Sequence, residues 1–138
     1  RDIWNYLQMA NPTDRQKYID AISLSADYVL GANPSGMIYV TGLGSRHTEY
    51  PLHFDSDASI RAGGEAAPGI SVFGPVGAVP ARVYYDFGLN TFYPSFPQQP
   101  IMLRYADLPS FVRTNEFSVH ETMAPNAELL GVLYGLGK

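Results

Sequence analysis

One carboxylic acid, Glu116, stands among residues that could make it a general acid. Polar residues precede it and apolar residues flank it: Asn115, Thr114, Arg113, Phe111, Val112 and Phe117. Burial disfavours the charged form of a carboxyl and raises its pKa, which suits a general acid near neutrality. The alternative is a helix start, with Asn115 as the N-cap and Glu116 in the first turn. The residues by themselves favour this helix start, because acidic residues commonly begin helices.

A second concentration of polar side chains follows the Gly42-Leu43-Gly44 turn. It contains histidines, acids, an arginine and a tyrosine: Arg46, His47, Glu49, Tyr50, His53, Asp55 and Asp57. Imidazole and carboxylate are ordinary metal ligands, but the spacing fits none of the tight zinc patterns. The cluster is either a sugar-binding wall, with Tyr50 or Phe54 stacking on a sugar, or a solvated polar loop. The sequence leaves these two interpretations open.

Other catalytic arrangements find less support in the sequence. Glycoside hydrolysis needs two carboxylates across the scissile bond, and Asp55 or Asp57 could in principle pair with Glu116. An Asp-Ser-Asp run is as often a turn or a cap, however, and nothing else marks it. No Gly-x-Ser-x-Gly elbow occurs for a nucleophilic serine. The Gly42-Leu43-Gly44 turn lacks the further glycines of a phosphate-binding loop.

Composition narrows the range of ligands. The chain has 138 residues, a net charge of -4 and no cysteine. Without a concentrated basic face it is not expected to bind nucleic acid, and it contains no apolar run of the roughly 20 residues that a membrane span needs. Ten Tyr, seven Phe and one Trp are the notable excess. Aromatic faces with polar neighbours suit sugars, although most of these rings are expected to fix long loops in place.

Helical spacing marks the two ends of the chain and is missing between them. A capping pattern at Thr13 and apolar residues at three- and four-residue steps predict a helix over about 14–30, preceded by the tail of another within 1–10. Residues from about 32 to 111 form a proline-punctuated loop layer, in which 37–40, 70–73 and 81–85 are brief strands or extended loop. Helical spacing returns over about 116–136. So few helices make a thin core, which implies further helices elsewhere.

Three segments carry a resemblance to a known family. Residues 27–44 read DYVLGANPSGMIYVTGLG, residues 105–116 read YADLPSFVRTNE, and Ala124-Pro125 follows. Together they resemble the C-terminal third of glycoside hydrolase family 9, the family of many endoglucanases. The first segment is similar to the family pattern at almost every position.

The resemblance implies a mainly α fold and an inverting enzyme. This chain, 1–138, would be the C-terminal part of the catalytic domain and supply closing helices and active-site loops of an (α/α)6 barrel, with at most a few short β-strands. Glu116 would be the general acid of a β-1,4-glycoside hydrolase acting on gluco-oligosaccharides or cellulose. The base belongs to an Asp-Ala-Gly-Asp motif that is not in this chain, so the rest of the barrel lies in the same or another chain. By itself the chain is expected to be inactive.

The same resemblance suggests which residues contact the sugar. Many family members carry Pro-His-His-Arg or Pro-His-Asp-Arg where this chain has Pro51-Leu52-His53-Phe54-Asp55. His53 keeps the imidazole, and aligning it with the first family histidine places Asp55 where the arginine would be. The expected substrate-binding residues are His53, Asp55, Arg46, Tyr50 and Tyr105. The expected supporting residues are Asn115 and Asp107.

An anion at position 55 leaves two further hypotheses open. It could favour a cationic sugar, so that the parent is an exo-acting relative working on glucosamine-containing oligosaccharides. Alternatively, the chain is a non-catalytic carbohydrate-binding or structural segment, since the catalytic Asp pair is absent. No cofactor is expected: calcium is known in parts of the family, but no calcium loop signature occurs here. The resemblance favours a secreted or periplasmic protein.

Overall fold

The computed structural model describes residues 7–8, 11–77, 92–108 and 111–137. Within these residues the chain is mainly helical, which confirms the predicted fold class. The elements in order are α2 (Pro12–Val29), α3 (Phe54–Arg61), 3-10 turns at Phe96–Gln98 and Ile101–Leu103, α5 (Val112–Asn115), a π-helical turn at Val119–Met123, and α6 (Ala124–Leu136). In the described part of the chain, no helix is long and apolar enough to cross a membrane.

Helix α2 begins slightly earlier than the predicted 14–30. Its N-cap is Asn11, whose side chain accepts a hydrogen bond from the Asp14 main-chain N–H at 3.0 Å. Pro12 then occupies the first helical position, where its missing N–H costs nothing. The capping pattern expected at Thr13 is therefore shifted to Asn11. The helix ends before Gly31, which has a φ of +105°.

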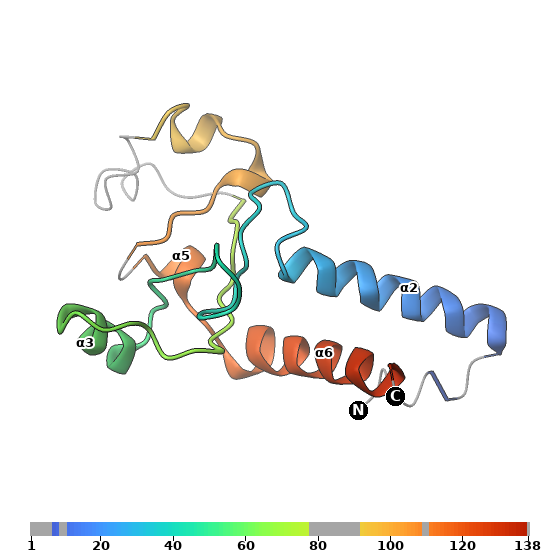
Figure 1. The fold of residues 1–138 in the computed structure, drawn as a ribbon. Coiled ribbons are helices and arrows are strands. Elements are labelled where there is room, and N and C mark those ends of the chain that lie inside the picture. Colours follow the sequence, from blue (N-terminus) through green and yellow to red (C-terminus); the bar gives the residue numbers. More distant parts are fainter. Residues whose placement is uncertain (1–6, 9–10, 78–91, 109–110, 138) are drawn as a thin grey trace.

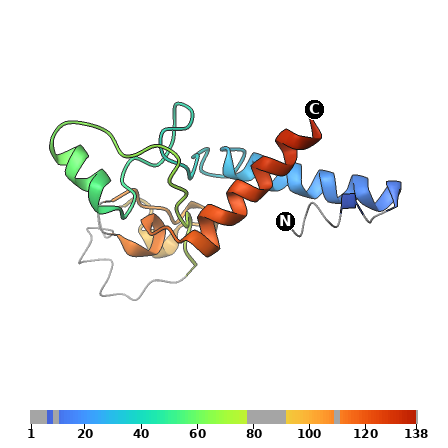
Figure 2. The ribbon, with the colours of Figure 1, turned by 90° about the horizontal axis from the view of Figure 1, so that it is seen from below.

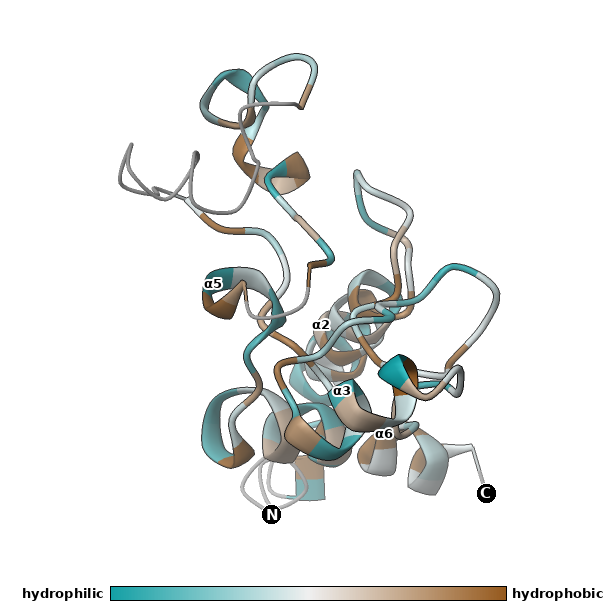
Figure 3. Cartoon of the chain, turned by 90° about the vertical axis from the view of Figure 1, so that its left-hand side faces the viewer, coloured by the Kyte–Doolittle hydropathy of each residue, from teal (hydrophilic) through white to brown (hydrophobic). Residues whose placement is uncertain are grey.

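Helices α2 and α6 run in opposite directions along one side of the molecule (Figures 1 and 2). Ile22 of α2 and Val132 of α6 are buried in one cluster with Leu7, which precedes α2, and the partly buried neighbours are Ile19, Leu129, Leu133 and Leu136. Hydrophobic and hydrophilic residues alternate along the ribbons of the helices (Figure 3), and some large side chains of this pair are exposed. Leu24 is 70% exposed and Tyr134 is 67% exposed. The pair therefore has the thin core that the sequence predicted. Of the helix tail expected within 1–10, only residues 7–8 are described.

The helical end expected from about residue 116 begins later and irregularly. Ser118 caps it by accepting from the Glu121 N–H at 2.9 Å, and a π-helical turn over Val119–Met123 leads into α6. Pro125 lies in the first turn of α6, where a missing main-chain N–H is tolerated.

The loop layer contains a helix that the sequence analysis did not predict. Helix α3 (Phe54–Arg61) begins at His53, whose ring caps it, and has acidic residues in its first turn and Arg61 in its last. These are ordinary helix signals, but the segment is too short for apolar periodicity to show. The expected strands reduce to two isolated bridges in the described residues, Ile38 with His47 and Val40 with Ser71. Residues 81–85 lie outside the described residues.

Aromatic rings hold much of the loop layer together, as expected. One cluster buries Phe96, Ala106 and Phe111, with the Phe96 and Phe111 rings edge to face at 6.2 Å. A second buries Tyr39, Ile70 and Val72, with Tyr28 and Tyr105 among the residues packed against it. Edge-to-face ring pairs stabilise such clusters beyond their buried area.

Candidate active site

Glu116 lies immediately after helix α5, not at the start of a helix. Its φ of -66° and ψ of 146° are extended, and its main-chain N–H donates to Val112 O at 2.9 Å. Its carbonyl oxygen accepts from Phe73 N–H at 3.0 Å. The interpretation of Asn115 as an N-cap is therefore wrong, because Asn115 is the last residue of α5. The Glu116 side chain is partly exposed.

Asn115 is fully buried and joins neighbouring segments. Its side-chain Nδ2 donates to Ala106 O and Leu108 O, each at 2.8 Å. Its main-chain carbonyl oxygen accepts a hydrogen bond from Leu52 N–H at 2.8 Å. Since a buried amide costs free energy unless its hydrogen bonds are made, these contacts fix the main chain just before Glu116.

The Asp107 carboxylate accepts hydrogen bonds from other residues of the chain. Its Oδ2 accepts from Glu49 N–H at 2.6 Å, and its Oδ1 accepts from Tyr50 N–H at 3.1 Å and the Thr48 hydroxyl at 2.9 Å. The Tyr105 hydroxyl lies 3.2 Å from the same Oδ1. Asp107 thus connects the polar loop to the stretch before Glu116.

Tyr105 faces the interior through both its ring and its hydroxyl. The ring lies edge to face against Tyr39 at 5.1 Å, and the hydroxyl lies 2.6 Å from Thr48 Oγ1 and 3.0 Å from Asn115 Oδ1. Burial above all, and then the nearby charge of Asp107, raise the pKa of Tyr105 well above its ordinary value, so the phenol remains a proton donor. Its polar contacts are those of a structural residue.

His53 is brought beside the Glu116 segment. Its Nδ1 lies 2.9 Å from Ser56 Oγ at the start of α3, and its ring lies edge to face against Phe117 at 5.7 Å. Any ligand contact therefore falls to Nε2, the other ring nitrogen. Asp55 is exposed in the first turn of α3.

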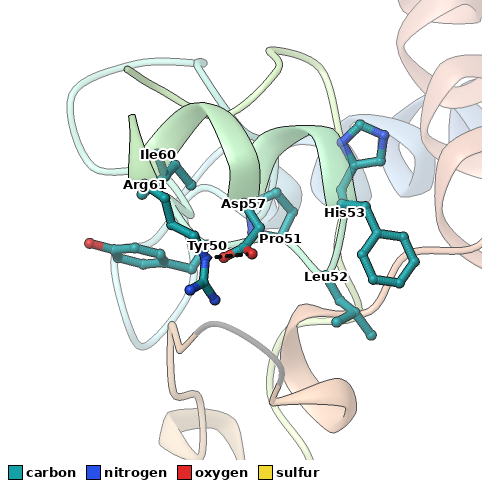
Figure 4. Close-up of a pocket in the computed structure, with 8 residues that line it drawn as sticks. Tyr50, Pro51, Leu52, His53, Asp57, Ile60 and Arg61 are labelled. Atoms are coloured by element: carbon teal, nitrogen blue, oxygen red, sulfur yellow. Dashed lines mark hydrogen bonds and ion pairs between the residues drawn. The ribbon is translucent and has the colours of Figure 1, made fainter. Parts of the chain in front are cut away.

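A small, mainly apolar cavity of about 170 Å³ lies between α3 and the chain that leads into it (Figure 4). Its lining is Tyr50, Pro51, Leu52, His53, Phe54, Asp57, Ile60 and Arg61. Asp57 and Arg61 form an ion pair on its wall at 2.8 Å. Because Leu52 bonds to Asn115 and His53 contacts Phe117, this cavity adjoins the residues on both sides of Glu116.

A second cavity of about 300 Å³ shares Tyr50 and Ile60 with the first. Its lining adds the acids Glu49 and Glu65 and the imidazole of His47. The sequence analysis did not select Glu65 or Ile60, since only the fold brings them to Tyr50. Arg46 lines neither cavity; its guanidinium lies toward Gly36. No group of three or more His, Asp or Glu side chains in the described ranges could hold a metal ion.

Comparison with known proteins identifies the family. The model of Glycosyl hydrolase family 9 matches residues 4–133, so the chain belongs to that family, and the resemblance found from the sequence motifs is confirmed. A solved structure described as AaCel9A in complex with cellobiose-like isofagomine is similar, with a TM-score of 0.68 and 28% identity. The match covers 89% of this chain and 20% of that one, so the chain spans a fifth of the length of the solved structure. No curated protein matches.

Proposed function

We propose that this chain supplies the general acid, Glu116, of an inverting β-1,4-glycoside hydrolase that acts on gluco-oligosaccharides or cellulose. Family membership supports the hydrolase class. The similar structure, in complex with a cellobiose-like isofagomine, supports a β-linked glucose substrate. The rest of the barrel domain completes the site.

The contrast between two nearby carboxylates carries this proposal. Asp107 has its oxygens occupied by protein donors. Glu116 is fixed through its main-chain N–H and C=O, while its carboxyl makes no hydrogen bond or ion pair to any other described residue. A carboxyl group is able to deliver a proton when its main chain is held in place and its oxygens are not already hydrogen-bonded to other described residues. His53 and the cavity beside it then offer an imidazole and an apolar wall to the sugar.

In the proposed reaction, the Glu116 carboxyl protonates the oxygen of the departing sugar. An aspartate outside this chain activates a water molecule on the opposite face of the sugar ring. Inversion requires the two carboxyls to stand about 6.5–9.5 Å apart, which leaves room for that water. Proton transfer of this kind contributes about 10²- to 10⁴-fold to the rate.

Glu116→Gln in the complete enzyme tests the acid role. The amide keeps the shape of the side chain but cannot donate a proton as an acid, so turnover of cello-oligosaccharides should fall by about 10²-fold or more. Aryl glycosides with activated leaving groups need little protonation and should lose much less. Glu121→Gln, an exposed acid in the π-helical turn, is the control. Equal losses on both substrates, or no loss, would rule out the acid role for Glu116.

The acidic second cavity favours one alternative substrate. Glu49 and Glu65 line it, and carboxylates form charge-assisted hydrogen bonds with ammonium groups. These acids support the alternative drawn from the sequence, an exo-acting enzyme that works on glucosamine-containing oligosaccharides, in its choice of a cationic sugar; exposed Asp55 is a further anion. Initial rates of the complete enzyme on chitosan oligomers, cellodextrins and polymeric cellulose distinguish the two. Preference for the polymer, with internal cuts, would exclude the alternative.

A further inference from the structure

The His53 ring is attached to helix α3 through one of its two nitrogens. Nδ1 accepts a hydrogen bond from the Ser56 main-chain N–H at 3.3 Å and lies 2.9 Å from Ser56 Oγ. A main-chain N–H can only donate, so Nδ1 carries no proton in this arrangement. The proton of the neutral imidazole is therefore on Nε2, since the hydrogen bond made by one ring nitrogen decides the state of the other.

The Ser56 hydroxyl is buried, and a segment beyond α3 sets its direction. Ser56 is 1% exposed, and its Oγ accepts a hydrogen bond from Ala67 N–H at 3.0 Å. Ala67 is held in turn, because its carbonyl oxygen accepts from the Thr41 hydroxyl at 2.6 Å. Since Oγ accepts from Ala67, its hydrogen is available to donate to His53 Nδ1. Nδ1 then has two donors from one residue, and both require it to be unprotonated.

The other ring nitrogen of His53, Nε2, makes no hydrogen bond to any residue in the described ranges. The ring lies edge to face against Phe117 at 5.7 Å, the residue that follows Glu116. In Figure 4 the ring lies away from Asp57 and Arg61, which are paired with each other. Nε2 is thus left for a ligand next to the segment that carries Glu116.

We infer that Ser56 is a positioning residue, which holds His53 as a hydrogen-bond donor so that its Nε2–H binds an oxygen atom of the sugar. The inference rests on the proposed function, since it takes the ligand beside Glu116 to be a sugar. An Nε2–H group needs an acceptor, which a hydroxyl oxygen provides and an ammonium group does not. The amino group of a glucosamine unit would therefore not lie opposite His53. Ser56 itself does not touch the sugar.

Nitrogen NMR of the complete enzyme, with ¹⁵N in its histidine rings, tests the position of the proton directly. An unprotonated ring nitrogen resonates well downfield of a protonated one, and comparison with His53→Gln identifies the signals of His53. At a pH where the ring is neutral, we expect Nδ1 to have the shift of an unprotonated nitrogen and Nε2 that of a protonated one. A proton on Nδ1 would overturn the inference, and this measurement needs no variant of Ser56.

Ser56→Ala removes one of the two donors to Nδ1. We expect the two nitrogen shifts of His53 to move toward each other, because the two protonation forms then interchange. We also expect kcat/KM on cello-oligosaccharides to fall about 5-fold, which is the effect of one hydrogen bond. Ser59→Ala, the same change at a partly exposed position of α3, is the matched control and should leave both quantities unchanged. Unchanged nitrogen shifts in Ser56→Ala would contradict the positioning role.

A double-mutant cycle with His53→Ala separates positioning from a general structural role. If Ser56 acts through His53, Ser56→Ala should have little further effect on kcat/KM in the His53→Ala enzyme. The same loss in both backgrounds would show that Ser56 acts independently of His53, and the inference would fail.

Failure of this inference can be told from failure of the proposed function. The protonation of His53 is read without turnover, whereas the acid role is read from the substrate dependence of Glu116→Gln. If Glu116→Gln lowers the turnover of both substrates equally, the proposed function fails, and with it the sugar as the partner of Nε2–H. If Glu116→Gln behaves as expected and Nδ1 carries the proton, only the role of Ser56 fails.

Discussion

The helix pair α2–α6 and the loop layer are stabilised in different ways. In the helix pair, the main-chain groups are satisfied within each helix, and the contact is apolar, through Leu7, Ile22 and Val132. In the loop layer and the short helix α5 beside it, buried polar side chains satisfy the main chain instead. Thr41, Thr48, Thr114 and Asn115 are each no more than 1% exposed, and each makes side-chain hydrogen bonds to other parts of the layer.

The difference follows from the cost of unpaired main-chain groups. A helix pairs its own N–H and C=O groups, so any apolar residue of suitable size can cover it. A buried loop has no such ladder and must find a partner for each group. Individual polar residues are therefore required at individual positions in the loop layer, and α5, which leads to Glu116, lies beside this layer (Figure 1).

The largest effect is expected from removing a buried polar side chain. Asn115→Ala should lower the free energy of unfolding by about 3 kcal/mol, because three buried hydrogen bonds of its side chain are lost, to Ala106 O, Leu108 O and the Tyr105 hydroxyl, at about 1 kcal/mol each. Chemical denaturation measures this change. Asn11→Ala, the exposed cap of α2, is the matched variant and should cost about 1 kcal/mol. Equal costs would contradict the comparison between the two regions.

An apolar truncation in the helix pair should cost less. Ile22→Ala should lower the free energy of unfolding by about 2 kcal/mol, at the low end for such truncations, because the thin core lets neighbours and solvent fill the gap. Thermal or chemical unfolding provides the measurement, with Leu24→Ala as the control on the exposed face of the same helix. A cost for Ile22→Ala above that of Asn115→Ala would mean that the helix pair dominates stability.

A glycine substitution tests the loop layer without altering any polar group. Gly44 has a φ of +72°, and an added Cβ would lie 2.6 Å from Ile38 Cδ1. Gly44→Ala should therefore cost about 1 to 2 kcal/mol. Gly63→Ala shares the positive φ of +86° but its Cβ would meet nothing within 4 Å, so the difference in unfolding free energy between the two variants isolates the contact. No difference would show that the turn can shift freely.

The smallest effect is expected from alkaline pH. Burial raises the pKa of Tyr105 above its ordinary value of 10.0, so the phenol of the unfolded chain ionises first, which stabilises the unfolded state. Stability from this residue is complete below pH 10.0 and falls as the pH rises toward the higher folded pKa, by about 1 kcal/mol near pH 11. Unfolding curves of the protein and of Tyr105→Phe across this range provide the measurement. Parallel pH dependence in both would contradict the assignment.

Local patterns in the sequence predicted the helices better than the loops. The spacing from Tyr18 to Leu30 predicted α2 because helix periodicity is a property of neighbouring residues. Helix α3 was missed because only eight residues form it and its core-facing side has little apolar character. Asn115 and Glu116 fit the pattern of a helix start, but α5 ends there, since the partners of Asn115 come from 106 and 108.

The sequence by itself determined the family, through residues 27–44 and 105–116, and selected Glu116 as the candidate acid. It named Asp107 only as a supporting residue and did not show what its carboxylate contacts. Those contacts come from the tertiary structure, which places three donors from residues 48–50 on Asp107 and holds Glu116 through its main chain. The physical reason is that the chemistry available to a carboxylate depends on which donors reach it, and here those donors lie almost 60 residues away in the chain.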